Sequence, residues 1–122
     1  MAIIPYVAET LETLYGHTHL VSWTGLQVGD TGQPLGAPGA SDRSVQVSGV
    51  FGSDGRTIVE GSNETGAAPN FITLHDPFAS PIIFTGAGMA AISEISGLIR
   101  PRITGTDPTT LLTVSLVLRR ML

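Results

Sequence analysis

The sequence predicts an all-β domain: an antiparallel β-sandwich, jelly-roll-like, with an N-terminal arm. Short runs of alternating apolar and polar residues recur along the chain, and clusters of Gly, Pro and Asp separate them. No long stretch has the 3.6-residue period of an amphipathic helix. Seven or eight strands at this spacing in 122 residues fit one two-sheet domain. We therefore expect an arm of residues 1–16 and a single sandwich domain of residues 17–122.

The arm precedes the first clear strand pattern and carries several apolar side chains. The spacing of Val7, Leu11, Leu14 and Tyr15 allows one or two helical turns. Such a short helix is marginal alone, so we expect the arm to dock on its own sandwich or on a neighbouring subunit.

Residues 19–28 alternate as a strand, with Val21 and Trp23 on one face and a bulge expected at Gly25. The Gly- and Pro-rich segment 29–42 follows, and it predicts a long loop. Ordered loops of this length usually contact something.

Residues 44–51 give the clearest period-two pattern of the chain. The turn residues 52–55, Gly-Ser-Asp-Gly, join it to residues 56–60, and together they predict a β-hairpin. Residues 86–92 are small and ambiguous and allow a helical turn. Pro101 removes a ladder donor, which predicts an edge or bulged position for its strand. The remaining strands are expected at residues 71–75, 81–85, 98–104 and 110–120.

The composition points to an interface and away from nucleic acid. Hydrophobic residues make up 42% and charged residues only 13%, so we expect part of the apolar surface to be buried in an oligomer. The chain has no lysine and a net charge of −4, which disfavours binding to phosphate backbones. It has no cysteine, and neither a basic leader nor an apolar stretch long enough to cross a bilayer. We expect no nucleic-acid and no membrane partner.

No catalytic, cofactor or metal site is expected. His17, His19 and His75 offer three imidazoles, but His75 is far away in sequence and no acidic residue flanks the other two. No nucleophile elbow and no dinucleotide-binding glycine pattern is present. The aspartates lie beside Gly, Pro or short polar residues and are expected to cap turns; they are Asp30, Asp42, Asp54, Asp76 and Asp107. The chain is not expected to be an enzyme or to bind a small-molecule substrate.

Arg100, Arg102 and Trp23 each have two interpretations. The two arginines share one face of an extended segment, where they form either an intersubunit contact or a solvated edge. Trp23 is either a platform for sugar stacking or a core residue.

Several strand-and-turn phrases resemble small structural proteins of tailed bacteriophages, namely capsid decoration or cement proteins. The resemblance covers about residues 43–120, and the first 40 residues carry no matching phrase. It rests on Val45–Gly52, Val59–Glu64, Phe71–Pro77, Ile83–Gly88 and Ile99–Asp107.

The resemblance implies a virion protein that is assembled in the host cytoplasm and binds the capsid surface. Its partners would be the major capsid protein and further copies of itself, in a homo-oligomer with a trimer favoured over a dimer. Weak contacts repeated over a lattice would add up to a strong clamp. The candidate contact residues are Ile3, Ile4, Tyr6, Val7, Leu11, Leu14, Tyr15, Pro34, Leu35, Pro38, Arg100 and Arg102.

Two alternatives remain open. The first is a glycan- or receptor-binding β-sandwich of a tail fibre or baseplate, which residues 61–64 and Trp23 suggest. The second is a structural subunit of the tail or of the head–tail connector.

Overall fold

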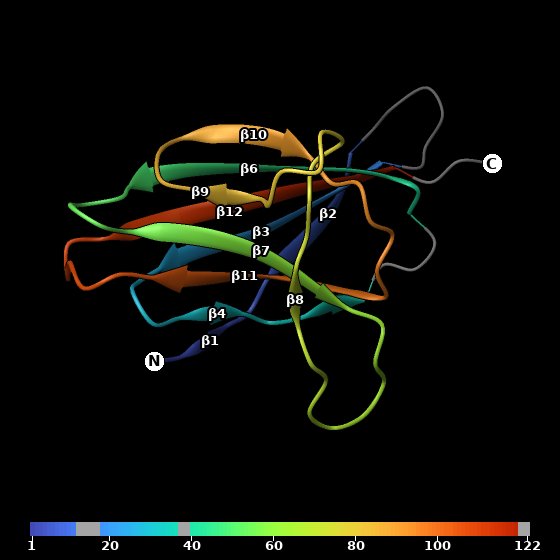
Figure 1. The fold of residues 1–122 in the computed structure, drawn as a ribbon, viewed down its shortest axis with the longest axis horizontal. Helices are drawn as coiled ribbons and strands as arrows, with labels where there is room; N and C mark the ends of the chain where they lie inside the picture. Colours follow the sequence, from blue (N-terminus) through green and yellow to red (C-terminus); the bar gives the residue numbers. More distant parts are fainter. Residues whose placement is uncertain (12–17, 37–39, 120–122) are drawn as a thin grey trace.

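The computed structural model describes residues 1–11, 18–36 and 40–119. The described residues form twelve β-strands in two sheets around one apolar core, and none of them lies in a helix (Figure 1). The predicted all-β sandwich is therefore confirmed. The chain changes sheet repeatedly, as in a jelly roll, so neighbours in sequence are often not neighbours in a sheet.

The seven-stranded sheet has the order β1-β4-β11-β7-β8, with β5 also paired to β11 and β9 to β7. Its pairs are antiparallel except for β1 and β4, which run parallel. The strands are β1 (Ile3–Ile4), β4 (Thr31–Gly32), β5 (Leu35–Gly36), β7 (Arg56–Ser62), β8 (Ile72–Thr73), β9 (Ile83–Phe84) and β11 (Leu98–Thr104).

The five-stranded sheet is antiparallel throughout, with the order β10-β6-β12-β3-β2. Its central strand β12 pairs with β6 over nine residues, which makes this the more regular sheet. The strands are β2 (Val7–Leu11), β3 (Thr18–Leu26), β6 (Asp42–Val50), β10 (Gly88–Ala91) and β12 (Leu111–Arg119).

The core lies between the sheets and follows the predicted alternation. Val21 and Trp23 are both buried, as are Val45 and Val47, which confirms the faces predicted for β3 and β6. The bulge at Gly25 is also confirmed. The register between β3 and β12 shifts by one residue at this position, and Gly25 adopts a φ of +71°.

The N-terminal segment is extended, so the helical turns that its spacing allows are wrong for residues 7–11. β1 joins the seven-stranded sheet and β2 the five-stranded one, so these residues dock on their own sandwich. Between the two strands, Tyr6 packs edge-on against Trp23, with ring centroids 6.1 Å apart. Ile4 and Tyr6 of this segment pack against the core, whereas Ile3 and Val7 are exposed. The boundary at residue 16 stays a prediction, since residues 12–17 lie outside the described residues.

The hairpin predicted for residues 44–60 is wrong. β6 pairs with β10 and β12, whereas β7 belongs to the opposite sheet, so residues 52–55 carry the chain across the sandwich. The Gly55 N–H donates to the carbonyl of Phe51 (3.0 Å), which closes a wider turn than a two-residue hairpin loop. Val45 and Val47 of β6 and Val59 of β7 are thereby buried in the same core.

Two aspartates clasp this turn to the β11–β12 connection. Asp54 accepts hydrogen bonds from the backbone N–H groups of Thr106 and Asp107 and from the Thr106 hydroxyl. Asp107 accepts in return from the Ser53 N–H (2.7 Å) and from the backbone and hydroxyl of Thr109. Each carboxylate thus caps its partner's turn, as predicted for these residues.

The strand that contains Pro101 is not at an edge, contrary to the prediction. β11 pairs with β7 along its whole length and with β4 and β5 on its other side. On this side, Arg102 pairs with β4 and Ile99 with β5, and no ladder pair includes Pro101 between them. The carbonyl of Gln33 in this gap instead accepts the Trp23 indole N–H (3.1 Å). The proline therefore lies in the sheet interior because its partner strand is interrupted.

Two further segments differ from the prediction. Residues 88–91 form the edge strand β10 and not a helical turn. Their side chains alternate as in a strand: Met89 and Ala91 face outward, while Ala90 packs on the core. The predicted loop 29–42 contains β4 and β5, which cover one side of β11. Residues 37–39 of that segment lie outside the described residues.

Replacing Thr57 by valine should stabilise the protein. The Thr57 side chain is fully buried, and its hydroxyl has no hydrogen-bond partner. Valine keeps the shape and removes the unsatisfied group, so we expect a gain of about 1 kcal/mol in the free energy of unfolding, measured by urea denaturation. Thr110→Val is the matched control, since the equally buried Thr110 hydroxyl donates to the Phe51 carbonyl (2.9 Å) and its loss should destabilise. A destabilised Thr57→Val would contradict this account.

The hydrogen bonds that Asp54 and Asp107 accept should make the stability of the protein depend on pH. Hydrogen bonds from Thr109 and Ser53 lower the pKa of Asp107 to about 2, and those from Thr106 and Asp107 lower the pKa of Asp54. Because both values fall below that of an unfolded aspartate, the stabilisation is complete above about pH 4 and is lost toward about pH 2. The urea midpoint of the wild type should therefore fall more steeply over this range than that of Asp54→Asn/Asp107→Asn. Equal slopes would exclude the clasp as the cause.

Candidate interaction surfaces

The structure divides the predicted contact residues between core and surface. Ile3 and Val7 are 70% and 71% exposed, and their contact role stays a prediction. Leu35 is buried, and the partly buried Ile4 and Tyr6 pack against the core. Pro34 and Leu11 are half-buried. Leu14, Tyr15 and Pro38 lie outside the described residues.

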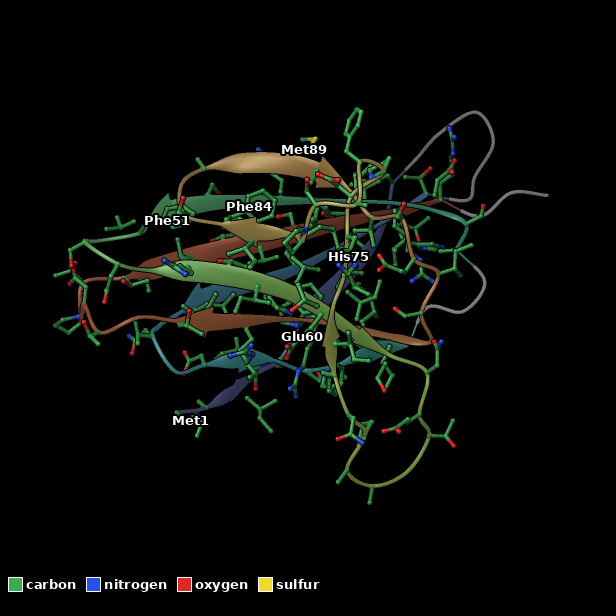
Figure 2. The ribbon with its side chains drawn as sticks, viewed as in Figure 1. Met1, Phe51, Glu60, His75, Phe84 and Met89 are labelled. Atoms are coloured by element: carbon green, nitrogen blue, oxygen red, sulfur yellow. The ribbon has the colours of Figure 1, made fainter. Side chains whose placement is uncertain are left out.

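The outer surface of the five-stranded sheet, here called the neutral face, is built mainly from apolar and small polar side chains. Met89 on edge strand β10 points away from the sandwich (Figure 2) and is 66% exposed, much like Val7 on the opposite edge strand. The strand registers place two rows across all five strands. One contains Val7, Ser22, Ser115, Gln46 and Met89, and the other Glu9, Leu20, Val117, Ser44 and Ala91.

Charge is confined to the margin of the neutral face. Asp42 and Arg119 are cross-strand partners and form an ion pair, which cancels their charges. Glu9 lies on edge strand β2. The free-energy cost of desolvating the centre of the face is therefore low, because no charged side chain there would lose its hydration. Its exposed apolar side chains also include Val50 and Leu111, which are cross-strand partners.

The outer surface of the seven-stranded sheet, here called the arginine face, is different. Glu60 on β7 is buried, and its two carboxylate oxygens bind Arg100 (2.8 Å) and Arg102 (3.2 Å) on β11. The guanidinium of Arg100 also lies 3.7 Å from the centroid of the Phe71 ring. The two arginines thus have partners within the chain, and their side chains remain 25% and 40% exposed. Nothing in the sequence marks Glu60 as their partner, because the pairing depends on strand register.

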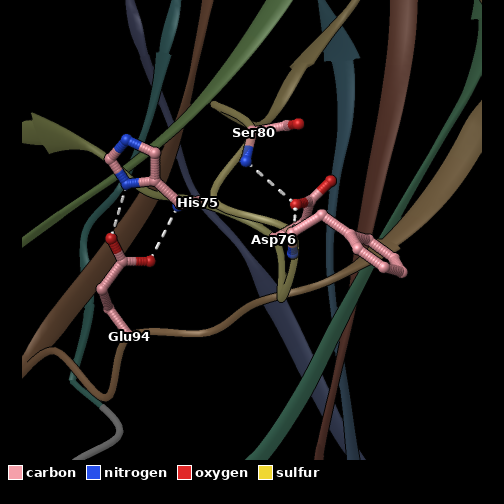
Figure 3. A network of polar contacts seen from close by, with 5 residues as sticks. His75, Asp76, Ser80 and Glu94 are labelled. Atoms are coloured by element: carbon pink, nitrogen blue, oxygen red, sulfur yellow. Dashed lines mark hydrogen bonds and ion pairs between the residues drawn. The ribbon is translucent and has the colours of Figure 1, made fainter.

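A third feature is the short loop of residues 76–80, which displays Phe78. The Asp76 carboxylate accepts hydrogen bonds from the backbone N–H groups of Phe78 (2.9 Å) and Ser80 (3.1 Å) (Figure 3). Two backbone bonds between Asp76 and residues 79 and 80 close the loop, and Ala79 adopts a left-handed φ of 63°. The Phe78 side chain at this loop is 89% exposed.

His75 and Glu94 fix the base of this loop. The Glu94 carboxylate accepts hydrogen bonds from the His75 backbone N–H and from ring atom Nδ1, both at 2.7 Å (Figure 3). Partial burial raises the pKa of Glu94, but the bonds from His75 outweigh it and leave the pKa below its ordinary value. The His75 carbonyl also accepts the Ser93 N–H (2.8 Å). The loop is therefore tied to the segment between β10 and β11.

The histidines do not form a metal site within the described residues. His19 Nδ1 lies 3.3 Å from the Thr10 hydroxyl, His75 binds Glu94, and no group of three potential ligands converges there. His17 lies outside the described residues. In the same part of the chain no helix is long and apolar enough to cross a membrane.

The remaining predicted sites have structural roles. Trp23 is 1% exposed, so the sugar-platform interpretation is wrong and the core interpretation is confirmed. Asp30 caps a turn by accepting the N–H groups of Ala2 and Gln27. Asp42 instead pairs with Arg119. Arg43, which the sequence analysis did not single out, is buried and donates to the carbonyls of Ala40 and Ser96; burial lowers its pKa.

Comparison with solved structures supports the fold. A protein derived from the SPBc2 prophage, YomS, has a TM-score of 0.56 at 13% identity, over 90% of this chain and 98% of that protein. The K2 cleaved adhesin domain of Lys-gingipain has a TM-score of 0.51 at 12% identity, over 97% of this chain and 83% of that domain. Neither a protein family nor a curated protein matches the sequence. At these identities the similarity shows a shared β-sandwich fold.

Arg100 should matter more to stability than Arg102. Arg100 makes the shorter bond to buried Glu60 and also covers Phe71, whereas Arg102 makes the longer bond and is more exposed. We expect Arg100→Ala to cost about 2 kcal/mol and Arg102→Ala about 1 kcal/mol in the free energy of unfolding, measured by urea denaturation. Equal costs would show that the stacked ring contributes nothing.

Proposed function

We propose that this chain is a non-enzymatic structural protein of a tailed-phage virion that binds the outer surface of the capsid. It would act as a decoration or cement protein that stabilises contacts between major capsid protein subunits. The observation that carries the proposal is the neutral face, a five-stranded surface with exposed apolar edges and little charge. Such a face suits repeated docking on a protein lattice, because little hydration is lost on contact.

Two further observations support the proposal. The phrases that resemble phage decoration proteins run through both sheets, from β6 to β11. The prophage-derived YomS shares the fold over nearly its whole length, which is compatible with a small phage protein of this architecture. The low charge of the chain and its lack of lysine fit a function in protein–protein contacts.

The neutral face replaces the arm as the main candidate contact. Because β1 and β2 belong to the two sheets and Tyr6 packs on Trp23, deleting residues 1–16 would damage the sandwich itself. Substitutions of exposed side chains test the contact without that complication.

The copy number of the chain per particle is the first test. Quantitative mass spectrometry of purified particles of the encoding phage should find copies comparable to the major capsid protein. A small fixed number would move the chain to the tail or connector, and its absence from particles would overturn the virion proposal.

A binding assay tests the face. Capsids assembled without this chain should bind the purified protein in co-sedimentation, and Val7→Asp/Met89→Asp should abolish binding because it places two carboxylates at the apolar edges. Ile83→Asp is the matched control, since Ile83 is 42% exposed on the arginine face. Loss of binding only in the control would assign the contact to the other sheet.

A glycan- or receptor-binding function is the second candidate. The loop of residues 63–71 extends away from the sheets (Figure 1) and carries Asn63, Glu64 and Asn70, and the fold is shared with an adhesin domain. The sequence also suggested Trp23 as a platform for sugar stacking, but Trp23 is buried and cannot contact a glycan. A glycan array without hits above background would remove this candidate.

A further inference from the structure

We infer that this chain self-associates by inserting Phe78 of one copy into a cleft beside β8 of a second copy. The loop of residues 76–80 is called the Phe78 knob, and the cleft is named the Ile72–Ile95 cleft after its two exposed apolar residues. This inference deepens the proposed function, because it names the contact of the proposed homo-oligomer.

The Phe78 knob has the properties of a binding anchor. Phenylalanine buries a large apolar area when it is covered, yet here 89% of it is exposed. The knob is held by the Asp76 carboxylate, by backbone bonds across the loop and by the His75–Glu94 pair at its base. Little conformational entropy is therefore lost on binding, which is the advantage of a preorganised contact.

The left-handed residue Ala79 also points to a function. A non-glycine residue at φ 63° is strained by about 1 kcal/mol, and the surrounding hydrogen bonds must hold it there. A glycine would relieve this strain but loosen the loop. The conformation instead fixes the direction in which the neighbouring Phe78 projects.

The complementary surface lies on the same chain. The Ile72–Ile95 cleft has a volume of about 390 Å³, within the range of about 300–1,000 Å³ for binding pockets. Leu74 lines it and is buried, while Ile72 and Ile95 are 70% and 58% exposed. One knob-in-cleft contact would cover three isolated apolar side chains, Phe78, Ile72 and Ile95, which otherwise remain in water.

Knob and cleft are parts of one rigid unit. Glu94 lines the cleft and also binds His75 at the base of the knob. On the other side, Phe71 directly before β8 is held by Arg100, which Glu60 fixes in turn. A copy that offers its knob therefore presents a preformed cleft beside it, so the contact can be repeated or reciprocated in a closed assembly.

Electrostatic repulsion between copies opposes this contact, and salt weakens that repulsion. Glu64 and Glu94 line the cleft and Asp76 lies in the knob, but each carboxylate already accepts hydrogen bonds within its own chain. Two copies still repel one another, because each carries a net charge of −4. Because salt screens that repulsion and leaves apolar contacts intact, association should strengthen as salt is raised.

Sedimentation equilibrium of the purified full chain tests the inference. The wild type should associate, and Phe78→Ser or Ile95→Asn should each weaken association at least about tenfold, as expected for losing a buried apolar side chain. Met89→Ser is the control, since it removes a similarly exposed apolar side chain from the neutral face and should leave association unchanged. Thermal melting of each variant verifies that it is folded.

Mixing the two variants distinguishes this contact from any other. Phe78→Ser keeps an intact cleft and Ile95→Asn keeps an intact knob, so two chains that are each monomeric should associate when they are combined. A wild type that is monomeric at all concentrations, association lost only in Met89→Ser, or no complementation on mixing would each overturn the inference. Loss of capsid binding by Phe78→Ser with unchanged self-association would also overturn it, by assigning the knob to the coat protein.

The self-association and mixing measurements need no phage particles. The inference can therefore fail while the chain is still found on the capsid, and it can hold while the copy number places the chain elsewhere.

Discussion

The burial of Trp23 is the constraint on which the arrangement of the two sheets depends. Its ring lies in the core and is covered by Tyr6, and its indole N–H is satisfied by the carbonyl of Gln33. A side chain at Gly32 would collide with both the indole nitrogen (2.7 Å) and Pro101 (2.5 Å). One large residue therefore fixes how the N-terminal segment, the β4–β5 segment and β11 meet.

The distribution of charge on the surface follows from the hydrogen bonds and ion pairs that charged side chains make within the chain. Most carboxylates serve the chain itself: Asp30, Asp54, Asp76 and Asp107 hold turns, and Glu60 and Glu94 fix an arginine pair and a histidine. Few charges remain for the outer surfaces, so the five-stranded sheet presents a nearly neutral face. The capacity of this protein for contacts thus follows from how its polar groups satisfy one another.

The wrong predictions of a β-hairpin and of an edge position for Pro101 have a common physical origin. The alternation of β6 and the glycines after it are real, but alternation shows only which side chains face the core. It does not show which strand will be the hydrogen-bond partner. Pro101 was placed at an edge for the same reason, because the interruption between β4 and β5 that accommodates it belongs to a segment 65 or more residues earlier in the chain. Ladder partners over such separations leave no local mark in the sequence.

Local sequence patterns were enough to predict the all-β class, the buried faces of β3 and β6, the bulge at Gly25 and the capping role of most aspartates. Each of these depends on local residue type and on period-two spacing, which act within a few residues. The folded arrangement of the chain was needed to reveal the sheet membership of β6 and β7, the Glu60 and Glu94 pairings, and the exposure of Phe78 beside the Ile72–Ile95 cleft. Those features join residues about 20 or more positions apart, or depend on what packs over a side chain. They are therefore consequences of the fold as a whole.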